Sequence, residues 1–434
     1  MATCPYTPDD LTRLFELDGE LVRCPFPLYD VLREQAPVTH NTRLGGWVVT
    51  RYHDIMEILR DTATFSSAMA SGPSSVTGLA RKLIDDPATA PRLRAQAERR
   101  LRIAESPVLL FTDPPLHKRQ RDLVRNAFGA RRIKLLEPDV RALTEELLDR
   151  LVEAAAHGPV DVVPMFSIPL PMTVIATMLG VPPSHMDTFK RWSNAFTAGV
   201  GAVDQTAEQI AEIFEAVDNF YDYFTDQIES RRSEPRDDLL TDLVSARTRD
   251  AEPLRVEEIL QMLVQFLVAG NETTTNMATT LLARLASDPE LAQRVRSNAA
   301  LVGPLVEEML RIEAPVQGMF RLSTADATVG GTSIPANSLI WLVYGSGNRD
   351  PSTFSEPEHV DLEADRALHL AFAQFEHFCL GANVAKLELR IAVEYLLARF
   401  ADLRPAGDPA GLPYHRSFIL RGISSLPLHL TPAS

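Results

Sequence analysis

Apolar residues recur at helical spacing along most of the first two-thirds of the chain. A short strand is expected at residues 47–50, just before the first of these amphipathic stretches. The later segment 165–181 is the most apolar run, and its prolines and its length favour a buried core helix over a membrane span. The spacing predicts helices over residues 53–60, 115–128, 140–156, 172–179 and 207–232.

A long stretch without internal proline runs from Pro253 to Pro289. This spacing predicts the longest helix of the chain, in a central position. Its apolar and small residues follow a helical period: Ile259, Met262, Leu263, Phe266, Ala269, Gly270, Thr273 and Met277.

The spacing of apolar residues changes after residue 314. Residues 325–344 alternate and contain Gly330-Gly331, which indicates short strands and turns, and a last helix is expected over 382–400. Residues 66–78 and 403–413 are loop-like, but neither separates halves of different composition. We therefore predict a mostly α protein with a smaller β-rich region, folded as one large domain over residues 1–434.

Composition narrows the classes of function. The chain is 45% hydrophobic and carries a net charge of −15, which disfavours nucleic acid and anionic membranes as partners. Three cysteines, Cys4, Cys24 and Cys379, are too few for a disulfide framework. The first residues show no signal-peptide pattern, so a soluble, cytoplasmic protein without a membrane span is expected.

One of the three cysteines lies in an aromatic loop. Residues 372–381 read Phe-Ala-Gln-Phe-Glu-His-Phe-Cys-Leu-Gly, and a helix is expected to begin near Leu380. The N–H groups and partial positive charge of a helix N-terminus favour a thiolate over a thiol at Cys379. A thiolate is a suitable ligand for iron, whereas a buried structural cysteine is the plainer interpretation of the loop alone.

The middle of the long helix is locally inconsistent with a helix. Residues 269–274 read Ala-Gly-Asn-Glu-Thr-Thr, and glycine there costs about 1 kcal/mol relative to alanine. Such inconsistency is expected at functional sites. A kink, or threonine hydroxyls that bond to the preceding carbonyls, is the alternative interpretation.

Together these segments resemble the cytochrome P450 family. Phe372, His377 and Gly381 match the family's positions around its haem-ligating cysteine. The resemblance implies the cytochrome P450 fold, with the long central helix over a haem b that is bound through Cys379. It also implies that His377 binds a haem propionate.

The resemblance gives the central helix an oxygen-binding groove. It implies that Gly270 leaves room for dioxygen, that the Thr273 hydroxyl donates a hydrogen bond to it, and that Glu272 relays protons from solvent. Two residues of the cysteine loop depart from the family: Ala373 and Phe375 stand where it usually has glycine. Because glycine serves positions of positive φ or close approach, this departure bears on loop geometry and redox potential.

Further charged residues match the family's supporting positions. Glu308 and Arg311 share a helix face and resemble its buried Glu-x-x-Arg pair, although exposed pairs at this spacing are more common. The family's third member is expected at Ala364. Either Arg366 replaces it through a shifted backbone or that member is missing.

Three basic residues are implied as ligands of the haem propionates. These are His117, Arg121 and Arg321. For the first two, a solvated basic helix face is the alternative. The segment from Asn348 to Pro351 also resembles a family segment, and a simple turn is equally compatible with it.

The substrate is expected to be a hydrophobic small molecule. By resemblance, the pocket includes Phe266, Ala269, Gly270, Met319 and Ile419. The preceding segment 66–110 is long for the family and carries a row of arginines, which could cover the site, bind an acidic group or form the solvated face of an inserted helix. The row consists of Arg92, Arg94, Arg99, Arg100 and Arg102.

No glycine-rich flavin or nicotinamide motif follows a predicted strand. The resemblance therefore implies a monooxygenase that uses dioxygen and electrons from a separate ferredoxin and ferredoxin reductase to hydroxylate or dealkylate its substrate. A peroxide-driven haem oxidase and a non-catalytic haem sensor remain as alternatives. A set of basic residues could form a docking face for the ferredoxin, or could simply be scattered surface charge. These residues are Lys118, Arg119, Arg125, Arg131, Arg132, Lys386 and Arg390.

Overall fold

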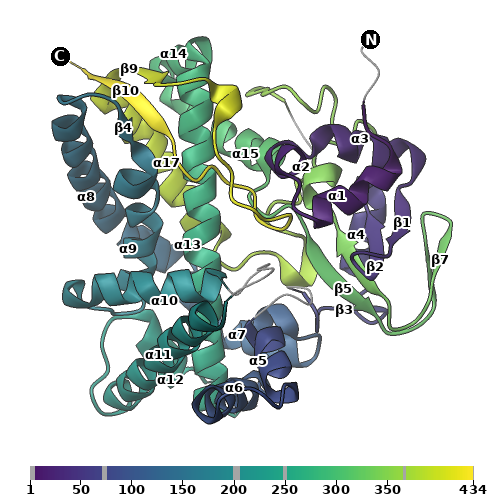
Figure 1. The fold of residues 1–434 in the computed structure, drawn as a ribbon. Helices are drawn as coiled ribbons and strands as arrows, with labels where there is room; N and C mark the ends of the chain where they lie inside the picture. Colours follow the sequence, from purple (N-terminus) through teal and green to yellow (C-terminus); the bar gives the residue numbers. More distant parts are fainter. Residues whose placement is uncertain (1–4, 71–75, 199–205, 248–251, 365–367, 434) are drawn as a thin grey trace. The chain divides into compact units, whose positions relative to one another are not determined.

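The computed structural model describes residues 5–70, 76–198, 206–247, 252–364 and 368–433. Helices account for 60% of the chain and strands for 11%, which confirms the mostly α prediction. The chain forms two compact units from interleaved segments. The first comprises Met1–Phe65, Ile133–Pro171 and Thr273–Ser434, and the second comprises Ser66–Arg132 and Met172–Glu272 (Figure 1).

A five-stranded sheet, in the order β1-β2-β8-β5-β3, belongs to the first unit. β1 and β2 are antiparallel, β2 runs parallel to β8, and β5 is antiparallel to β8. Ile340 and Leu342 pack on one side with α4 (Tyr52–Arg60), and Trp341 packs on the other with α3 (Phe26–Gln35). The strands are β1 (Val38–Asn41), β2 (Gly46–Val49), β3 (Phe65–Ser66), β5 (Met319–Ser323) and β8 (Leu339–Leu342).

The helix α17 (Ala382–Arg399) of the first unit packs on α14 (Pro289–Ser297) and α15 (Val302–Glu313). A second sheet has the order β4-β10-β9, and β6 pairs with β7. The remaining elements are α1 (Leu11–Phe15), α2 (Gly19–Arg23), β4 (Val160–Asp161), β6 (Ala327–Val329), β7 (Thr332–Ile334), α16 (Tyr344–Gly347), β9 (Phe400–Pro405) and β10 (Pro427–Pro432).

The second unit is helical in its described residues. Trp192, Phe220 and Phe224 form an aromatic core between α10 and α11, with ring centroids 4.6–6.2 Å apart. The helices are α5 (Val76–Asp85), α6 (Pro91–Ala104), α7 (Leu116–Val124), α10 (Met186–Ala198), α11 (Ala207–Ser233) and α12 (Leu239–Ser245).

Three helices contribute residues to both units: α8 (Ala130–Ala155), α9 (Pro169–Met178) and α13 (Val256–Ser287). At 32 residues, α13 is the longest described helix, as predicted. Its residues at helical spacing, Ile259, Met262 and Leu263, are almost completely buried. Their burial is the packing that stabilises a long helix beyond its intrinsic propensity.

Several predicted boundaries were wrong. α8 begins at Ala130 rather than at residue 140 and contains Pro138, so the proline did not mark a helix start. The segment 165–181 is a π-helical turn (Val163–Ser167) followed by α9, because two prolines interrupt it. Part of the predicted loop 403–413 extends β9, whose Leu403 pairs with Leu430.

Other predictions concern residues around the second unit. The helix α7 begins after its N-cap Pro115, close to the predicted start at residue 115. The Asp113 carboxylate accepts hydrogen bonds from Ser66 Oγ at 2.5 Å and Ser67 N at 2.8 Å. Within the predicted loop 66–78, residues 71–75 lie outside the described residues, and α5 begins at Val76.

Candidate functional site

The cysteine loop leads directly into α17. A 3₁₀ turn (Phe375–His377) precedes the cysteine, and Cys379 N donates a hydrogen bond to the Phe372 carbonyl oxygen at 2.8 Å. Cys379 is exposed and precedes the N-cap of α17, Gly381, by two residues. The helix begins at Ala382, in agreement with the predicted range 382–400, and its unpaired N–H groups favour negative charge in the adjacent loop.

Ala373 and Phe375 both adopt a backbone conformation that normally requires glycine. Their φ angles are +54° and +58°. A left-handed residue with a Cβ costs roughly 1–2 kcal/mol relative to glycine. The loop therefore keeps a glycine-type path despite its two substitutions, and the surrounding contacts must supply the difference.

The ring of Phe375 contacts a cation rather than the core. Its side chain is 41% exposed, and Arg60 Cζ, at the end of α4, lies 4.9 Å from the ring centroid. Phe378, next to the cysteine, is 37% exposed. The ring of Phe375 is therefore in contact with an arginine of a neighbouring helix, in an interaction worth about 0.5–1 kcal/mol at an exposed position.

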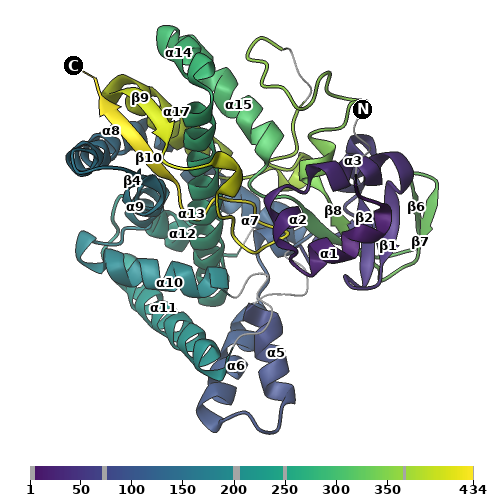
Figure 2. The same ribbon diagram turned by 45° about the horizontal axis from the view of Figure 1, so that its top comes forward.

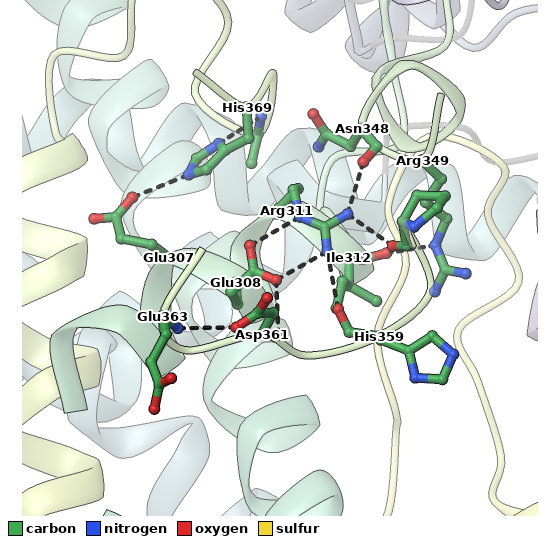
Figure 3. Close-up of polar contacts among 12 residues, drawn as sticks. Glu307, Glu308, Arg311, Ile312, Asn348, Arg349, His359, Asp361, Glu363 and His369 are labelled. Atoms are coloured by element: carbon green, nitrogen blue, oxygen red, sulfur yellow. Dashed lines mark hydrogen bonds and ion pairs between the residues drawn. The ribbon is translucent and has the colours of Figure 1, made fainter. Parts of the chain in front are cut away.

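Arg311 and Glu308 form the buried pair that was predicted (Figure 3). Arg311 Nε and Nη2 each donate to a Glu308 carboxylate oxygen at 2.9 Å, and the arginine is 1% exposed. The guanidinium also donates to the carbonyl oxygens of Asn348 at 3.0 Å and Pro357 at 2.7 Å. Arg366, the candidate to replace the third member, lies outside the described residues.

The segment from Asn348 to Asp350 is more than a simple turn. Arg349 Nε donates to Ile312 O at 3.0 Å, and the Asp350 carboxylate accepts from Tyr52 N at 2.9 Å, where α4 begins. Asn348 Oδ1 accepts from Leu370 N at 2.6 Å, two residues before the cysteine loop. This buried segment thus joins α15, α4 and the approach to the cysteine.

A second charged cluster lies beside the start of the loop. Glu307 accepts hydrogen bonds from Lys386 Nζ at 2.7 Å and from His369 Nε2 at 3.1 Å. Burial alone would raise the pKa of Glu307, but the hydrogen bonds from His369 and Lys386 outweigh it and lower the pKa to about 2. The cluster joins α15 and α17 to the segment before Phe372.

Sequence reasoning missed Glu388 on α17. It is 2% exposed, its Oε2 atom has no hydrogen-bond partner among the described residues, and burial raises its pKa well above the ordinary 4.5. The available signal was its spacing, because Glu388 lies four residues after Val384 and four before Ala392, which are both apolar. Glu388 is a neutral acid in the folded protein wherever the pH is below its raised pKa.

Replacing Glu388 by glutamine should stabilise the protein at neutral pH. Because the pKa of Glu388 is higher in the folded than in the unfolded protein, its carboxyl group lowers the free energy of unfolding increasingly as the pH rises above the pKa of the unfolded state. We expect the free energy of unfolding to increase by about 1–3 kcal/mol at pH 7, and to change little below about pH 4.5. Denaturant unfolding across this pH range measures the difference.

Glu307→Gln is the matched control, with the opposite sign. Its lowered folded pKa stabilises the protein above the ordinary value of 4.5, and that contribution disappears as the pH falls toward 2. Glu307→Gln should therefore lower the free energy of unfolding, and by the largest amount at neutral pH. A Glu388→Gln effect that did not vary with pH would contradict a buried, titrating carboxyl group.

Arg321 and two predicted pocket residues lie on or beside strand β5. Arg321, on β5, is 3% exposed, and its Nη1 donates to the Phe320 carbonyl oxygen at 2.8 Å. Met319 begins the same strand and is half-buried. Ile419 is buried, and its carbonyl oxygen accepts from Gln317 N at 2.7 Å, so the tail runs beside the segment that leads into β5.

In the second unit, His117 and Arg121 lie one turn apart on α7. His117 is 1% exposed and Arg121 is half-buried. Burial of His117 excludes the alternative of a fully solvated basic face. A buried basic side chain beside a half-buried arginine is suited to an anionic group.

The motif of the central helix is continuous helix, without a kink. Phe266 is buried against the ring of Phe128 at 5.1 Å, and Ala269 is exposed. A Cβ placed on Gly270 would meet Ile175 at an ordinary 3.5 Å, so packing within this unit does not require glycine here. Glu272 and Thr273 follow, both half-buried.

The sequence-predicted site residues fall in both units. Thr273, Arg321, His377 and Cys379 belong to the first unit, with Met319 and Ile419. The second unit holds His117, Arg121, Glu272, Phe266, Ala269 and Gly270. Glu272 and Thr273 are nevertheless consecutive on α13, so their proximity is fixed by the helix itself.

Several of the basic residues considered for a docking face already have acidic partners. Arg132 contacts Asp237 and Asp242, each at 2.8 Å, and Lys118 contacts Asp122 at 2.8 Å. Lys386 is the partner of Glu307. These pairs favour scattered, locally neutralised surface charge over a uniform basic face.

No described helix is long and apolar enough to cross a membrane.

Comparison with known proteins adds independent findings. A family model described as "Cytochrome P450" matches residues 66–421. The chain is 34% identical over 428 residues to "Cytochrome P450 107B1" of Saccharopolyspora erythraea, covering 97% of this chain and 99% of that protein. It is 35% identical over 405 residues to "Mycinamicin IV hydroxylase/epoxidase" of Micromonospora griseorubida, covering 92% and 94% of the two chains.

Solved structures agree. A cytochrome P450 from Chondromyces apiculatus matches with a TM-score of 0.81 at 33% sequence identity, covering 96% of this chain and 98% of that one. The Bacillus subtilis cytochrome P450 PksS of bacillaene synthesis matches with the same TM-score at 30% identity, covering 96% and 99%.

Proposed function

Because the chain belongs to the cytochrome P450 family of haem-iron monooxygenases, we propose that it uses dioxygen to hydroxylate or oxidatively dealkylate a hydrophobic organic substrate, as one catalytic domain spanning residues 1–434. The observation that carries this proposal is the cysteine loop. Its glycine-type path persists although Ala373 and Phe375 replace the glycines, and it presents an exposed Cys379 at the start of α17. A left-handed backbone without glycine costs free energy, and such strained residues are concentrated at functional sites.

The residues fit a haem b bound through Cys379. The exposed thiol beside a helix N-terminus is suited to bind iron as a thiolate. Two acidic propionates need cationic or hydrogen-bonding partners, and we assign His377 and the buried Arg321 of the first unit, and His117 and Arg121 of the second, to that role. When bound, a thiolate-ligated haem supplies the iron chemistry that activates dioxygen.

The chain's own contribution to oxygen activation is proton delivery from α13. Glu272 and Thr273 are adjacent and half-buried, so one side chain can exchange protons with solvent while the other donates a hydrogen bond. Gly270 lacks a side chain although Ile175 leaves space for a methyl group, which supports a role in making room for dioxygen. We propose that Glu272 relays protons and that Thr273 passes them to the oxygen.

Thr273→Ala should therefore divert electrons from product. Without the hydroxyl, protons are delivered less selectively, and we expect the fraction of electrons recovered in product to fall by roughly 10-fold or more, with hydrogen peroxide rising instead. The measurement is product and peroxide per electron consumed, with a substrate found by screening hydrophobic compounds.

Thr280→Ala is the matched control. The Thr280 hydroxyl donates to the Asn276 carbonyl oxygen at 2.8 Å within the same helix, and it therefore serves only the backbone. It should leave the product fraction unchanged. Equal product fractions for Thr273→Ala and the wild type would contradict the proton-delivery role and would favour a peroxide-driven oxidase.

The substrate and partners follow from the family and the pocket residues. Phe266, Met319 and Ile419 are apolar and at least half-buried, which supports a hydrophobic ligand. Curated relatives include proteins named "6-deoxyerythronolide B hydroxylase" and "Vitamin D(3) 25-hydroxylase". We propose that electrons come from a separate ferredoxin and ferredoxin reductase, in the cytoplasm.

Spectroscopy provides the direct test. The reduced, CO-bound protein should show the red-shifted absorption band of thiolate-ligated haem. A band typical of histidine ligation would refute Cys379 as the ligand. A thiolate band together with dioxygen binding but no product from any electron supply or substrate would instead indicate a haem sensor.

A further inference from the structure

The inserted helix α6 presents arginines in two directions. On one face, Arg99 binds two acids of α11, Asp218 at 3.2 Å and Asp222 at 2.6 Å. Arg92 lies 3.8 Å from Glu215 of the same helix. Figure 2 shows α6 beside the end of α11, and these pairs account for that contact. On this face, α6 forms the solvated surface that was one alternative for the whole arginine row.

Arg100 points the other way and is buried. It is 8% exposed, and its Nη1 donates to Tyr221 Oη at 2.6 Å and to Gln261 Oε1 at 3.1 Å. Both partners are more than nine-tenths buried as well, at 0% and 8% exposed. Three elements of one unit, α6, α11 and α13, therefore contribute polar side chains to a single enclosed point.

Nothing in this cluster balances the charge of Arg100. Burial raises the pKa of Tyr221, although Arg100 opposes that shift, so the phenol is neutral near pH 7, and Gln261 is uncharged. Among the described residues, no carboxylate lies within ion-pair distance of Arg100, and its Nε atom has no hydrogen-bond acceptor. The acids of α11 that could have served, Asp218 and Asp222, are bound by Arg99.

An arrangement of this kind is unfavourable without an anion. Arginine stays protonated in proteins and has five N–H donors, and only the two on Nη1 have acceptors among the described residues. A buried charge left unpaired costs several kcal/mol. Burial of a cation among neutral partners is therefore expected where a ligand supplies the opposite charge.

The cluster lies on the same strip of α13 as the predicted pocket residue Ala269. Gln261, Gln265 and Ala269 are spaced four residues apart, so they form one strip on the helix surface. Eight residues at 1.5 Å per residue place Ala269 about 12 Å along the axis from Gln261. Ala269 is exposed, and Gly270 follows it.

We propose that Arg100, assisted by Tyr221 and Gln261, binds the carboxylate of the substrate, which is then a hydrophobic carboxylic acid oxidised at a position away from its carboxyl group. The inference rests on the proposed monooxygenase function and names its substrate class. A single guanidinium with two neutral partners matches one negative charge, whereas a phosphate dianion would leave charge uncompensated. Arginine also offers the planar pair of donors that a carboxylate accepts.

The test compares ligands that differ only in charge. Dodecanoic acid, methyl dodecanoate and dodecanol are titrated into the haem-loaded, full-length protein, and binding is measured by the spin-state shift and by the increase in melting temperature. We expect the acid to bind at least about tenfold more tightly than the ester, which corresponds to about 1.4 kcal/mol. Arg100→Gln should remove that preference and leave binding of the ester nearly unchanged.

Arg99→Gln is the matched control, since it removes a neighbouring arginine that already has acidic partners. It should keep the preference for the acid. Equal binding of acid and ester by the wild type would overturn the proposal, whether or not Arg100→Gln folds. The same holds for a preference that survives in Arg100→Gln.

Regiochemistry gives a second readout. With acids of increasing length, oxidation should stay at a constant distance from the carboxyl group in the wild type. A constant distance from the methyl end would contradict the anchor. The CO-bound spectrum is recorded on the same samples, so that failure of the haem-thiolate assignment is separated from failure of the carboxylate site.

Discussion

Replacing Cys379 by serine should eliminate the thiolate-type band of the reduced, CO-bound protein and lower monooxygenase activity by at least a factor of about 100. Changing a residue that only orients a metal ligand costs 10–100-fold, so removal of the ligand should cost at least as much. The serine hydroxyl is nearly isosteric but is not ionised near neutral pH and is a harder ligand. The two measurements are the CO-difference spectrum and the turnover rate at saturating substrate.

The chain offers a matched control in Cys24. It is exposed like Cys379 and lies between α2 and the N-cap of α3, but its segment has no residue of positive φ such as Ala373 and Phe375 of the cysteine loop. Cys24→Ser should keep the band and the activity. Retention of the band in Cys379→Ser, or its loss in Cys24→Ser, would show that the ligand has been assigned to the wrong residue.

Replacing Arg311 by alanine should destabilise the protein by about 3–5 kcal/mol, enough to prevent haem incorporation in most molecules. The change leaves Glu308 as a buried carboxylate without its bidentate partner and removes the hydrogen bonds to Asn348 and Pro357. These carbonyls belong to the irregular segment that leads toward the cysteine loop (Figure 3). Haem content per polypeptide and the denaturation midpoint measure the effect.

An exposed pair and a double variant make the test specific. Arg294 and Glu363, 2.5 Å apart, are both well exposed, and Arg294→Ala should cost at most about 1 kcal/mol. The double variant Glu308→Leu with Arg311→Met should be less destabilised than Arg311→Ala, because no unpaired charge remains. A double variant that is worse than either single change would indicate that the hydrogen bonds to carbonyls, rather than the charge balance, dominate.

The sequence predicted the family, the mostly α fold and the buried Glu308–Arg311 pair, and these predictions are confirmed. The family could be predicted because the cysteine loop, the Ala-Gly-Asn-Glu-Thr run and the Glu308–Arg311 pair occur together in one chain. The role of Cys379 as the iron ligand stays a prediction. The roles of His117, Arg121, Glu272, Thr273 and His377 stay predictions. Helix boundaries were less accurate, as at α8, because packing of the helix tolerates Pro138 near its start.

Contacts between distant segments could not be predicted from spacing. The orientation of Arg100 depends on Tyr221 and Gln261, which are 121 and 161 residues away. The hydrogen bond from Leu370 to Asn348 likewise depends on how two irregular segments meet. Helical periodicity identifies the buried face of one helix but not the partner that faces it, so Arg100 was indistinguishable from Arg99 in the sequence.

The left-handed backbone at Ala373 and Phe375 has a consequence for how such proteins are recognised. A sequence signature that demands glycine at both positions would pass over this chain, although its backbone follows the same path. The shape of the loop is thus determined by its neighbours, including Arg60 and the segment held by Asn348, and tolerates drift in the residues that a signature records. Surveys of genomes for this enzyme class should also accept residues other than glycine at these two positions.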